Sequence, residues 1–424
     1  MKHITTICRY LVGLLFIFSG LIKANDPLGF SYKLMEYFEV FSAKIAFLHP
    51  MWELLIKISL PVAMFLVVLE ALLGVAVIAG YGMKLTSWAL LLLILFFTAL
   101  TFGSAQFKIV QSCGCFGDAI PLTPWQSFTK DLVLLILVLV IFSQRKKIQP
   151  GEITVTDYVM QVTGLAFLAW LSTKLEWFFP VIYPATIILL FLILKAVIRD
   201  KAPAVTTFIA VISLSWFTGY CYNNLPMKDF RAYATGKSIP EQMQGVPDSV
   251  KYIYNLKNKA TGEKKQFDKF PPDYEKEWDY LGFDTQILKK GKEAKIHDFN
   301  MIGADGADYT EDVTTNPDYN FLLVEYDLNK TNREIQTKIN GFAEQCKKDN
   351  IPFMAVTSSD KQLLKKFKEE THISYDFYFA DQITLKTIIR SNPGLVLLKN
   401  GVVKGQWHWR NFPDYSELKK VMVK

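Results

Sequence analysis

The sequence predicts a multi-domain protein in which an α-helical polytopic membrane bundle precedes a water-soluble α/β domain. Hydrophobic residues make up 51% of the 424 positions, and they crowd the first half, whereas Lys, Asp and Glu crowd the second. Seven apolar stretches approach the ~20 residues needed to cross ~30 Å of hydrocarbon. After residue 295, strand and helix patterns alternate, which is typical of an α/β fold.

The membrane half is expected to cross the bilayer seven times. The predicted spans are 5–22, 55–80, 86–106, 127–143, 155–173, 179–198 and 203–221. The first contains Arg9, whose long side chain can reach the membrane surface. It could also be a signal peptide, but no A-x-A cleavage site follows. The fifth is the weakest because Asp157 and Gln161 lie near one end.

Basic residues in the short loops predict the orientation of the bundle. If the chain crosses the membrane seven times, all of these basic residues lie on the same side of the membrane, and that side is expected to be cytoplasmic. They are Lys2, Arg9, Lys84, Arg145, Lys146, Lys147, Arg199 and Lys201. The C-terminal half then faces the exterior, which is the periplasm for a bacterial inner-membrane protein. Part of the net charge of +7 lies in these loops, and no nucleic-acid motif accompanies it. The predicted partners are the lipid bilayer and a periplasmic protein, with no nucleic acid.

Two thiols separated by one glycine form the strongest chemical signal. Cys113, Gly114 and Cys115 lie in the polar break between the third and fourth spans, on the predicted periplasmic side. Gly114 permits the tight turn of so small a disulfide ring, and strain in such a ring makes a disulfide more oxidising. The pair is therefore a candidate catalytic centre for thiol–disulfide exchange. Cys221, at the outer end of the last span, is a candidate relay thiol.

Other roles for these thiols stay open. One stable disulfide could staple the loop, or both thiols could cap a turn. A soft-metal site would be incomplete with two cysteines and no nearby histidine, so no metal is predicted.

Three ionisable residues within or beside the spans, Lys23, Glu70 and Asp131, are candidates for supporting roles. Such groups are expensive in the bilayer and tend to face the bundle interior. Glu70 is the most deeply placed of them. It could form an ion pair with Lys23 or take part in proton handling.

The first 147 residues resemble the DoxX/MauE family of four-helix membrane proteins. The resemblance is carried by Arg9…Gly13…Phe16-x-x-Ser19-Gly20-x-x-Lys23, Glu70-x-x-x-Gly74, Cys113-Gly114-Cys115-Phe116-Gly117-Asp118 and Trp125-x-x-Phe128-x-x-Asp131. It implies a role in disulfide formation in a periplasmic enzyme, with Gly114 and Asp118 supporting the thiols. The bundle of this family resembles that of the vitamin K epoxide reductase group, which uses C-x-x-C. Three additional spans are expected at 148–222, outside the resemblance.

Residues 223–294 are predicted to form a tether and a β-hairpin region. Turn formers are frequent in 223–250, and as a flexible coil these ~28 residues would average roughly 25–30 Å end to end. The runs 251–256 and 264–267, separated by a turn sequence, indicate a hairpin.

Residues 295–424 resemble the thioredoxin superfamily. Strands are expected at 296–302, 320–327, 352–358, 375–380, 394–399 and 402–409, and helices at 332–349, 360–371 and 382–390. The resemblance makes Pro393 the candidate for the cis proline of that fold. The expected C-x-x-C is missing, because 327–333 contain no cysteine. Cys346 is interpreted as a small core residue, which leaves this domain a docking role.

Taken together, these features predict an inner-membrane thiol–disulfide redox protein acting on exported proteins, and therefore a possible oxidoreductase. No cofactor is certain from the sequence, and a quinone is the candidate electron acceptor. The alternative is a non-enzymatic scaffold or assembly factor whose periplasmic tail binds a partner. A transporter is less favoured, because no inverted repeat or pair of broken helices is found.

Overall fold

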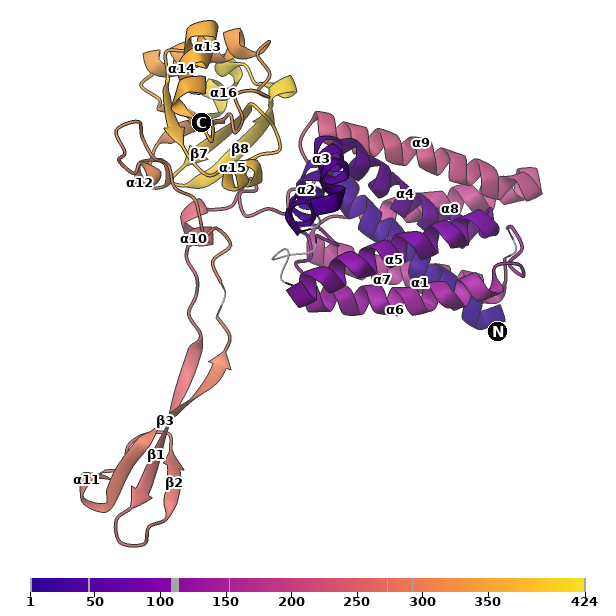
Figure 1. Cartoon of the computed structure of the whole chain (residues 1–424), viewed down its shortest axis with the longest axis horizontal. Coiled ribbons are helices and arrows are strands. Elements are labelled where there is room, and N and C mark those ends of the chain that lie inside the picture. The colour runs from indigo at the N-terminus through magenta and orange to yellow at the C-terminus, as the bar shows by residue number, and fades with distance from the viewer. Residues whose placement is uncertain are drawn as a thin grey trace. The chain divides into compact units, whose positions relative to one another are not determined.

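The computed structural model describes residues 2–44, 46–107, 114–151, 153–272, 274–291 and 293–422. The chain divides into two compact units (Figure 1). The first comprises Met1–Arg231 and Arg410–Phe412, and the second comprises Ala232–Trp409 and Pro413–Lys424.

The described residues of the first unit form helices joined by turns and loops, with no strand among them. Its long helices are α1 (Lys2–Asn25), α4 (Ser59–Ala79), α5 (Met83–Phe107), α6 (Pro124–Gln144), α7 (Val155–Leu175), α8 (Phe179–Ile198) and α9 (Ala202–Asn223). Within the described residues, five helical stretches are long and apolar enough to cross a membrane, with α8 and α9 counted as the single stretch Phe179–Asn223. The protein is therefore a multi-pass membrane protein. Helix α7 is not among these stretches, although it covers the predicted fifth span.

Two helices were not predicted, α2 (Pro27–Lys44) and α3 (His49–Lys57), which are joined through a 3₁₀ turn at Ala46–Leu48. Helix α2 packs against α4, whereas α3 has no buried residue. The second predicted span therefore begins later than expected, at Ser59 instead of residue 55.

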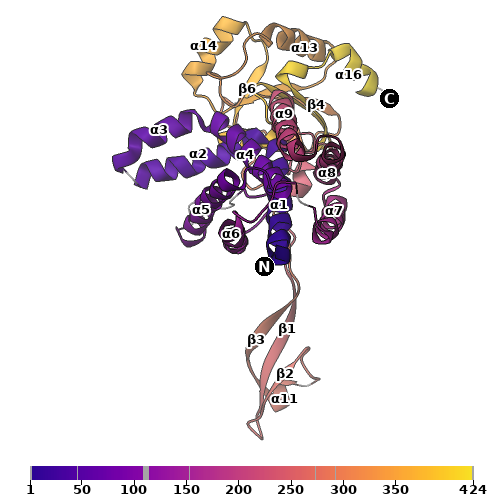
Figure 2. The same ribbon diagram turned by 90° about the vertical axis from the view of Figure 1, so that its right-hand side faces the viewer.

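Helix α1 is the centre of the bundle and packs against α4, α6 and α7 (Figure 2). Glycines allow the closest of these contacts. A Cβ on Gly74 would lie 2.5 Å from the carbonyl oxygen of Gly13, and a Cβ on Gly20 would lie 2.7 Å from the Cβ atom and 2.9 Å from the backbone nitrogen of Ala71. Only hydrogen fits at these positions, so α1 and α4 pack backbone to backbone.

The second unit is built on a five-stranded sheet in the order β6-β5-β4-β7-β8. The strands are β4 (Tyr319–Val324), β5 (Phe353–Thr357), β6 (Asp376–Phe379), β7 (Gly394–Lys399) and β8 (Val402–His408). Strands β4, β5 and β6 are parallel, and β7 runs antiparallel to β4 and β8. This is the order of a thioredoxin-like sheet. The helices are α12 (Thr310–Thr314), α13 (Gln336–Lys348), α14 (Lys361–Thr371), α15 (Gln382–Ile388) and α16 (Tyr415–Met422), with a 3₁₀ turn at Trp409–Asn411.

The first predicted strand of this unit, 296–302, is wrong. Ile302 makes only isolated bridges, to Asp308 and to Phe379, where it covers the outer edge of β6. The remaining five predicted strands and three helices are present. The Asn400-Gly401 turn shows why the last two strands form a hairpin. Both residues have positive φ, as a two-residue hairpin turn requires, and they join β7 to β8.

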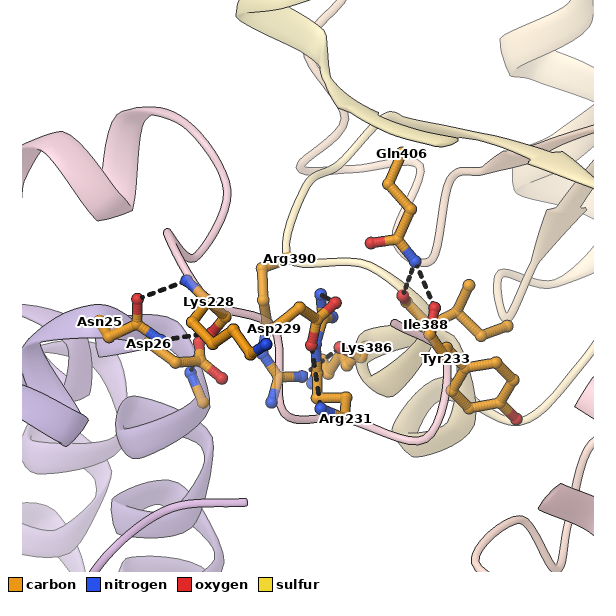
Figure 3. Close-up of polar contacts among 11 residues, drawn as sticks. Asn25, Asp26, Lys228, Asp229, Arg231, Tyr233, Lys386, Ile388, Arg390 and Gln406 are labelled. Atoms are coloured by element: carbon orange, nitrogen blue, oxygen red, sulfur yellow. Dashed lines mark hydrogen bonds and ion pairs between the residues drawn. The ribbon is translucent and has the colours of Figure 1, made fainter. Parts of the chain in front are cut away.

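The segment expected to be a tether is held at several points, each within its own unit (Figure 3). In the first unit, Asn25 exchanges two hydrogen bonds with the backbone of Lys228, of 2.7 and 3.1 Å. In the second, Gln406 donates to the carbonyl oxygens of Tyr233 and Ile388. The backbone of 236–239 also pairs with that of 401–403, so this segment covers the edge of β8.

A second sheet in this unit has the order β2-β1-β3, with β1 (Ser249–Asn258), β2 (Lys264–Phe267) and β3 (Trp278–Lys289). The predicted hairpin is confirmed as β1 and β2, whereas β3 was not predicted. Short helices α10 (Ile239–Met243) and α11 (Tyr274–Glu277) flank these strands. On one face, Asn255 bonds to both Gln266 and Asp284 across the three strands.

Candidate functional site

The thiol loop continues, in its described part, as a compact turn. Gly114 and Gly117 have φ of +66° and +51°, a conformation that side chains other than glycine rarely adopt. The N–H of Gly117 donates to the carbonyl oxygen of Gly114 at 3.1 Å, and that of Ala119 to Phe116 at 3.2 Å. Cys113 lies outside the described residues, whereas Cys115 lies within this turn and is half-buried.

Neighbouring helices fix the position of this turn. Ser19 of α1 donates a hydrogen bond of 2.9 Å to the backbone carbonyl of Cys115. The ring of Phe116 is buried against Phe18, with ring centroids 5.5 Å apart. On the other side, a Cβ on Gly114 would lie 3.2 Å from Cγ of Lys33 in the unpredicted helix α2. The turn is therefore anchored to α1 and lies close to Lys33 of α2.

Lys130 of α6 brings a positive charge to this turn. Its ammonium interacts electrostatically with Cys115, lies 5.3 Å from the ring centroid of Phe116, and forms a 2.5 Å ion pair with Asp131. A nearby cation stabilises a thiolate, and the thiolate is the reactive form of cysteine. Sequence reasoning missed Lys130. No local signal marks it, because its contacts with this turn are tertiary.

Buried polar groups continue from Lys130 into the bundle. Nζ of Lys23 lies 2.8 Å from Oε2 of Glu70, with both side chains buried, so the structure forms one of the two arrangements considered for Glu70. Asp131 accepts a 3.0 Å hydrogen bond from Thr101 of α5, and Glu70 acts electrostatically on Lys130. These groups connect α1, α4, α5 and α6 beneath the thiol turn.

Two further predicted site residues of this unit are Asp118 and Cys221. Asp118 is exposed at the end of the turn. Cys221 is buried near the end of α9, and its sulfur is hydrogen-bonded to the backbone of Met227. Cys221 forms no disulfide within the described part of the chain. Across the same residues, no group of three or more His, Cys, Asp or Glu side chains is arranged to hold a metal.

In the thioredoxin-like unit, the Asn392–Pro393 peptide is cis. The loop after β4 lies beside it, because Asn392 donates a 2.8 Å hydrogen bond to the carbonyl of Asp327, and its own carbonyl accepts one from Asn332. This loop occupies the place of the redox motif of the fold, yet 327–333 contain no cysteine.

The cysteine of this unit is unsuited to redox chemistry. Cys346 is fully buried in α13, and burial raises the pKa of its thiol to about 12, so the thiol stays protonated near neutral pH. Its expected role as a core residue agrees with this position. The thioredoxin-like unit therefore presents its fold without an exposed thiol among the described residues.

The apolar helices of the first unit define the class of the chain, which is a multi-pass membrane protein. Residues 1–144, roughly a third of the chain, match the model of a family described as methylamine utilisation protein MauE. No curated protein matches the chain.

Solved structures similar to part of the chain include two bacterial proteins. One is the thioredoxin domain of a thiol-disulfide oxidoreductase from Bacteroides vulgatus, 13% identical, covering 29% of this chain and 92% of that chain with a TM-score of 0.25. Another is StoA from Bacillus subtilis, 14% identical, covering 29% and 93% with a TM-score of 0.24. The thioredoxin-like fold of the second unit is assigned from its own strand order, β6-β5-β4-β7-β8.

Proposed function

We propose that this protein is a membrane thiol–disulfide redox protein that acts on exported proteins through Cys113 and Cys115. The observation that carries the proposal is the Lys130 ammonium, which lies 5.3 Å from the ring centroid of Phe116, next to Cys115 in the sequence, and interacts electrostatically with Cys115. A cysteine that served only to cap a turn would gain nothing from a neighbouring cation. A thiolate nucleophile is stabilised by it and reacts faster near neutral pH.

In this function, Cys113 and Cys115 form the redox pair and exchange with a client disulfide or dithiol. The basic loops support an arrangement in which the thiol loop and the second unit face the periplasm of a bacterial cell. The thioredoxin-like unit acts as a docking domain, which agrees with the buried Cys346 and the cysteine-free loop at 327–333.

Differential thiol labelling tests this proposal in intact cells. A membrane-impermeant maleimide is applied with and without mild reductant, and each cysteine is read by mass spectrometry. We expect Cys113 and Cys115 to be partly oxidised and to exchange on reduction. Thiols that stay fully reduced, or fully oxidised and inert, would contradict the redox role, and lack of labelling in reduced cells would contradict the orientation.

The role of the cation is tested by Lys130→Gln, with Lys57→Gln on the exposed surface of α3 as the matched control. Loss of the charge beside Cys115 should move the pH profile of its labelling upward by roughly 1 unit. The control should leave the profile unchanged. Equal profiles for both variants would remove the observation on which the proposal depends.

A scaffold function is the second candidate, favoured by the absence of cysteine at the redox position of the thioredoxin-like unit. The double variant Cys113→Ser/Cys115→Ser separates the two. Loss of oxidised exported proteins supports the redox function. Normal oxidation in this variant, with a defect only when the second unit is deleted, supports the scaffold.

A further inference from the structure

A groove of about 510 Å³ lies in the side of the membrane bundle and reaches the thiol turn. Leu14 and Phe18 of α1 form its base, and Phe167 and Leu171 of α7 form one wall. Phe116, from the thiol turn itself, is part of its lining. The groove is therefore continuous with the residue next to Cys115.

Helix α7 creates this groove. Helix α1 packs against α6 and against α7, which lie on either side of it (Figure 2). Gly164 of α7 also lines the groove, and a Cβ there would lie 2.1 Å from Cδ1 of Leu14. Since α7 lies beyond the matched residues 1–144, this wall is contributed by the additional part of the chain.

The lining is almost entirely apolar except where α6 meets the thiol turn. Gln126 and Lys130 are one helical turn apart on α6, and both line the groove. The Lys130 ammonium also lies over the ring of Phe116. This end offers hydrogen-bond donors and an aromatic surface, whereas the rest offers only hydrocarbon contacts.

These features match a flat ring with carbonyl oxygens and an apolar tail. The ring carbonyls can accept hydrogen bonds from Lys130 and Gln126, the ring can pack on Phe116, and the tail can follow the apolar walls. A volume of about 510 Å³ lies within the range of roughly 300–1,000 Å³ that small-molecule sites occupy. A phospholipid would instead bring a phosphate and two acyl chains to a site with one cation at its end.

We propose that this groove binds a prenylated quinone with its ring at Phe116, Gln126 and Lys130. This inference rests on the proposed function and assigns the site of its electron acceptor. Oxidation of the Cys113 and Cys115 thiols to a disulfide releases two electrons and two protons, which together reduce one quinone to its hydroquinone. Lys130 would serve both partners, as the cation beside the thiolate and as a donor to a ring carbonyl.

Binding of decylubiquinone to the purified full-length protein in detergent tests the site without requiring activity. Bound quinone is extracted after gel filtration and quantified by chromatography across a range of concentrations. Met160→Trp fills the groove from α7, and Val162→Trp, on the same helix but outside the groove and 69% exposed, is the matched control. We expect Met160→Trp and Lys130→Gln to weaken binding by about tenfold or more, and Val162→Trp to bind like the wild type.

Equal retention of quinone in the wild type and all three variants would overturn the assignment. Displacement of quinone by a modest excess of phospholipid would also overturn it, because a bilayer lipid would then be the occupant. An unchanged elution volume of each variant shows that it is folded. Maleimide labelling separates this inference from the proposed function. Thiols that exchange in a protein that binds no quinone refute the groove alone, and inert thiols in a protein that binds quinone refute the redox function alone.

Discussion

Glu325 is a fully buried carboxyl directly after β4, in the second unit. One of its oxygens accepts a 3.2 Å hydrogen bond from Thr331, and the other is buried without a hydrogen-bond partner. Burial raises its pKa from the ordinary value of 4.5 to about 8. Because the folded chain holds a proton that the unfolded chain releases between these two pH values, stability should fall as the pH rises from about 5 to about 8.

The variant Glu325→Gln should remove this pH dependence, since its amide is neutral and keeps an oxygen to accept from Thr331. Hydrogen exchange of the β4 amides in the full-length protein, corrected for intrinsic rates, measures the effect. We expect protection in the wild type to fall from pH 5 to pH 8, and protection in the variant to stay level. The exposed Glu344→Gln is the control. The same pH slope in Glu325→Gln and wild type would show that Glu325 is not the responsible group.

Helices α1 and α4 depend on glycine at their contact. A Cβ on Gly74 would meet backbone atoms of α1, the Gly13 oxygen at 2.5 Å and the Ile17 nitrogen at 2.9 Å, so the helices themselves must separate. Gly74→Val should therefore lower the folded yield and the detergent melting temperature markedly, and should disturb the ion pair of Lys23 with Glu70 that joins the same two helices.

Gly219→Val on α9 is the matched control, because nothing lies within 4 Å of a Cβ at that position. Both variants put the same residue in a membrane helix, and both are compared by gel filtration and thermal unfolding. If Gly74→Val were as stable as Gly219→Val, close packing would not explain the contact between α1 and α4.

Periodicity predicted those elements whose pattern is strong and local. The long apolar runs became helices, and the alternating strands around Asn400-Gly401 became β7 and β8. Helix α2 was missed because its mean apolarity is too low for a membrane span. The strand predicted at 296–302 is absent because, within it, Ile302 pairs only at single bridges. Lys130 was missed for a different reason. Its role comes from the turn that packs onto α6, a tertiary contact that no local pattern encodes.

The second unit contains the contacts that it needs to fold by itself. Its largest buried side chains include Phe299, Phe321 and Phe367, all from its own part of the chain. The segment at 236–239 pairs with the edge of β8, so a chain that starts at residue 232 retains this cover. Starting at residue 295, the boundary expected from the sequence, would leave that edge of the sheet open for pairing with another chain.

A fragment of residues 232–424 should therefore be soluble, monomeric and cooperatively folded, whereas 295–424 should aggregate. The two fragments are compared by gel filtration, circular dichroism and urea unfolding. The shorter fragment lacks both the segment that covers β8 and the β1–β3 sheet. A third fragment, 232–424 with the strands 249–289 replaced by a short Gly-Ser linker, lacks only the β1–β3 sheet and so tests the two losses separately. It should behave like 232–424, because the β8 cover remains. Aggregation of this third fragment would shift the cause from the open β8 edge to the loss of the β1–β3 sheet.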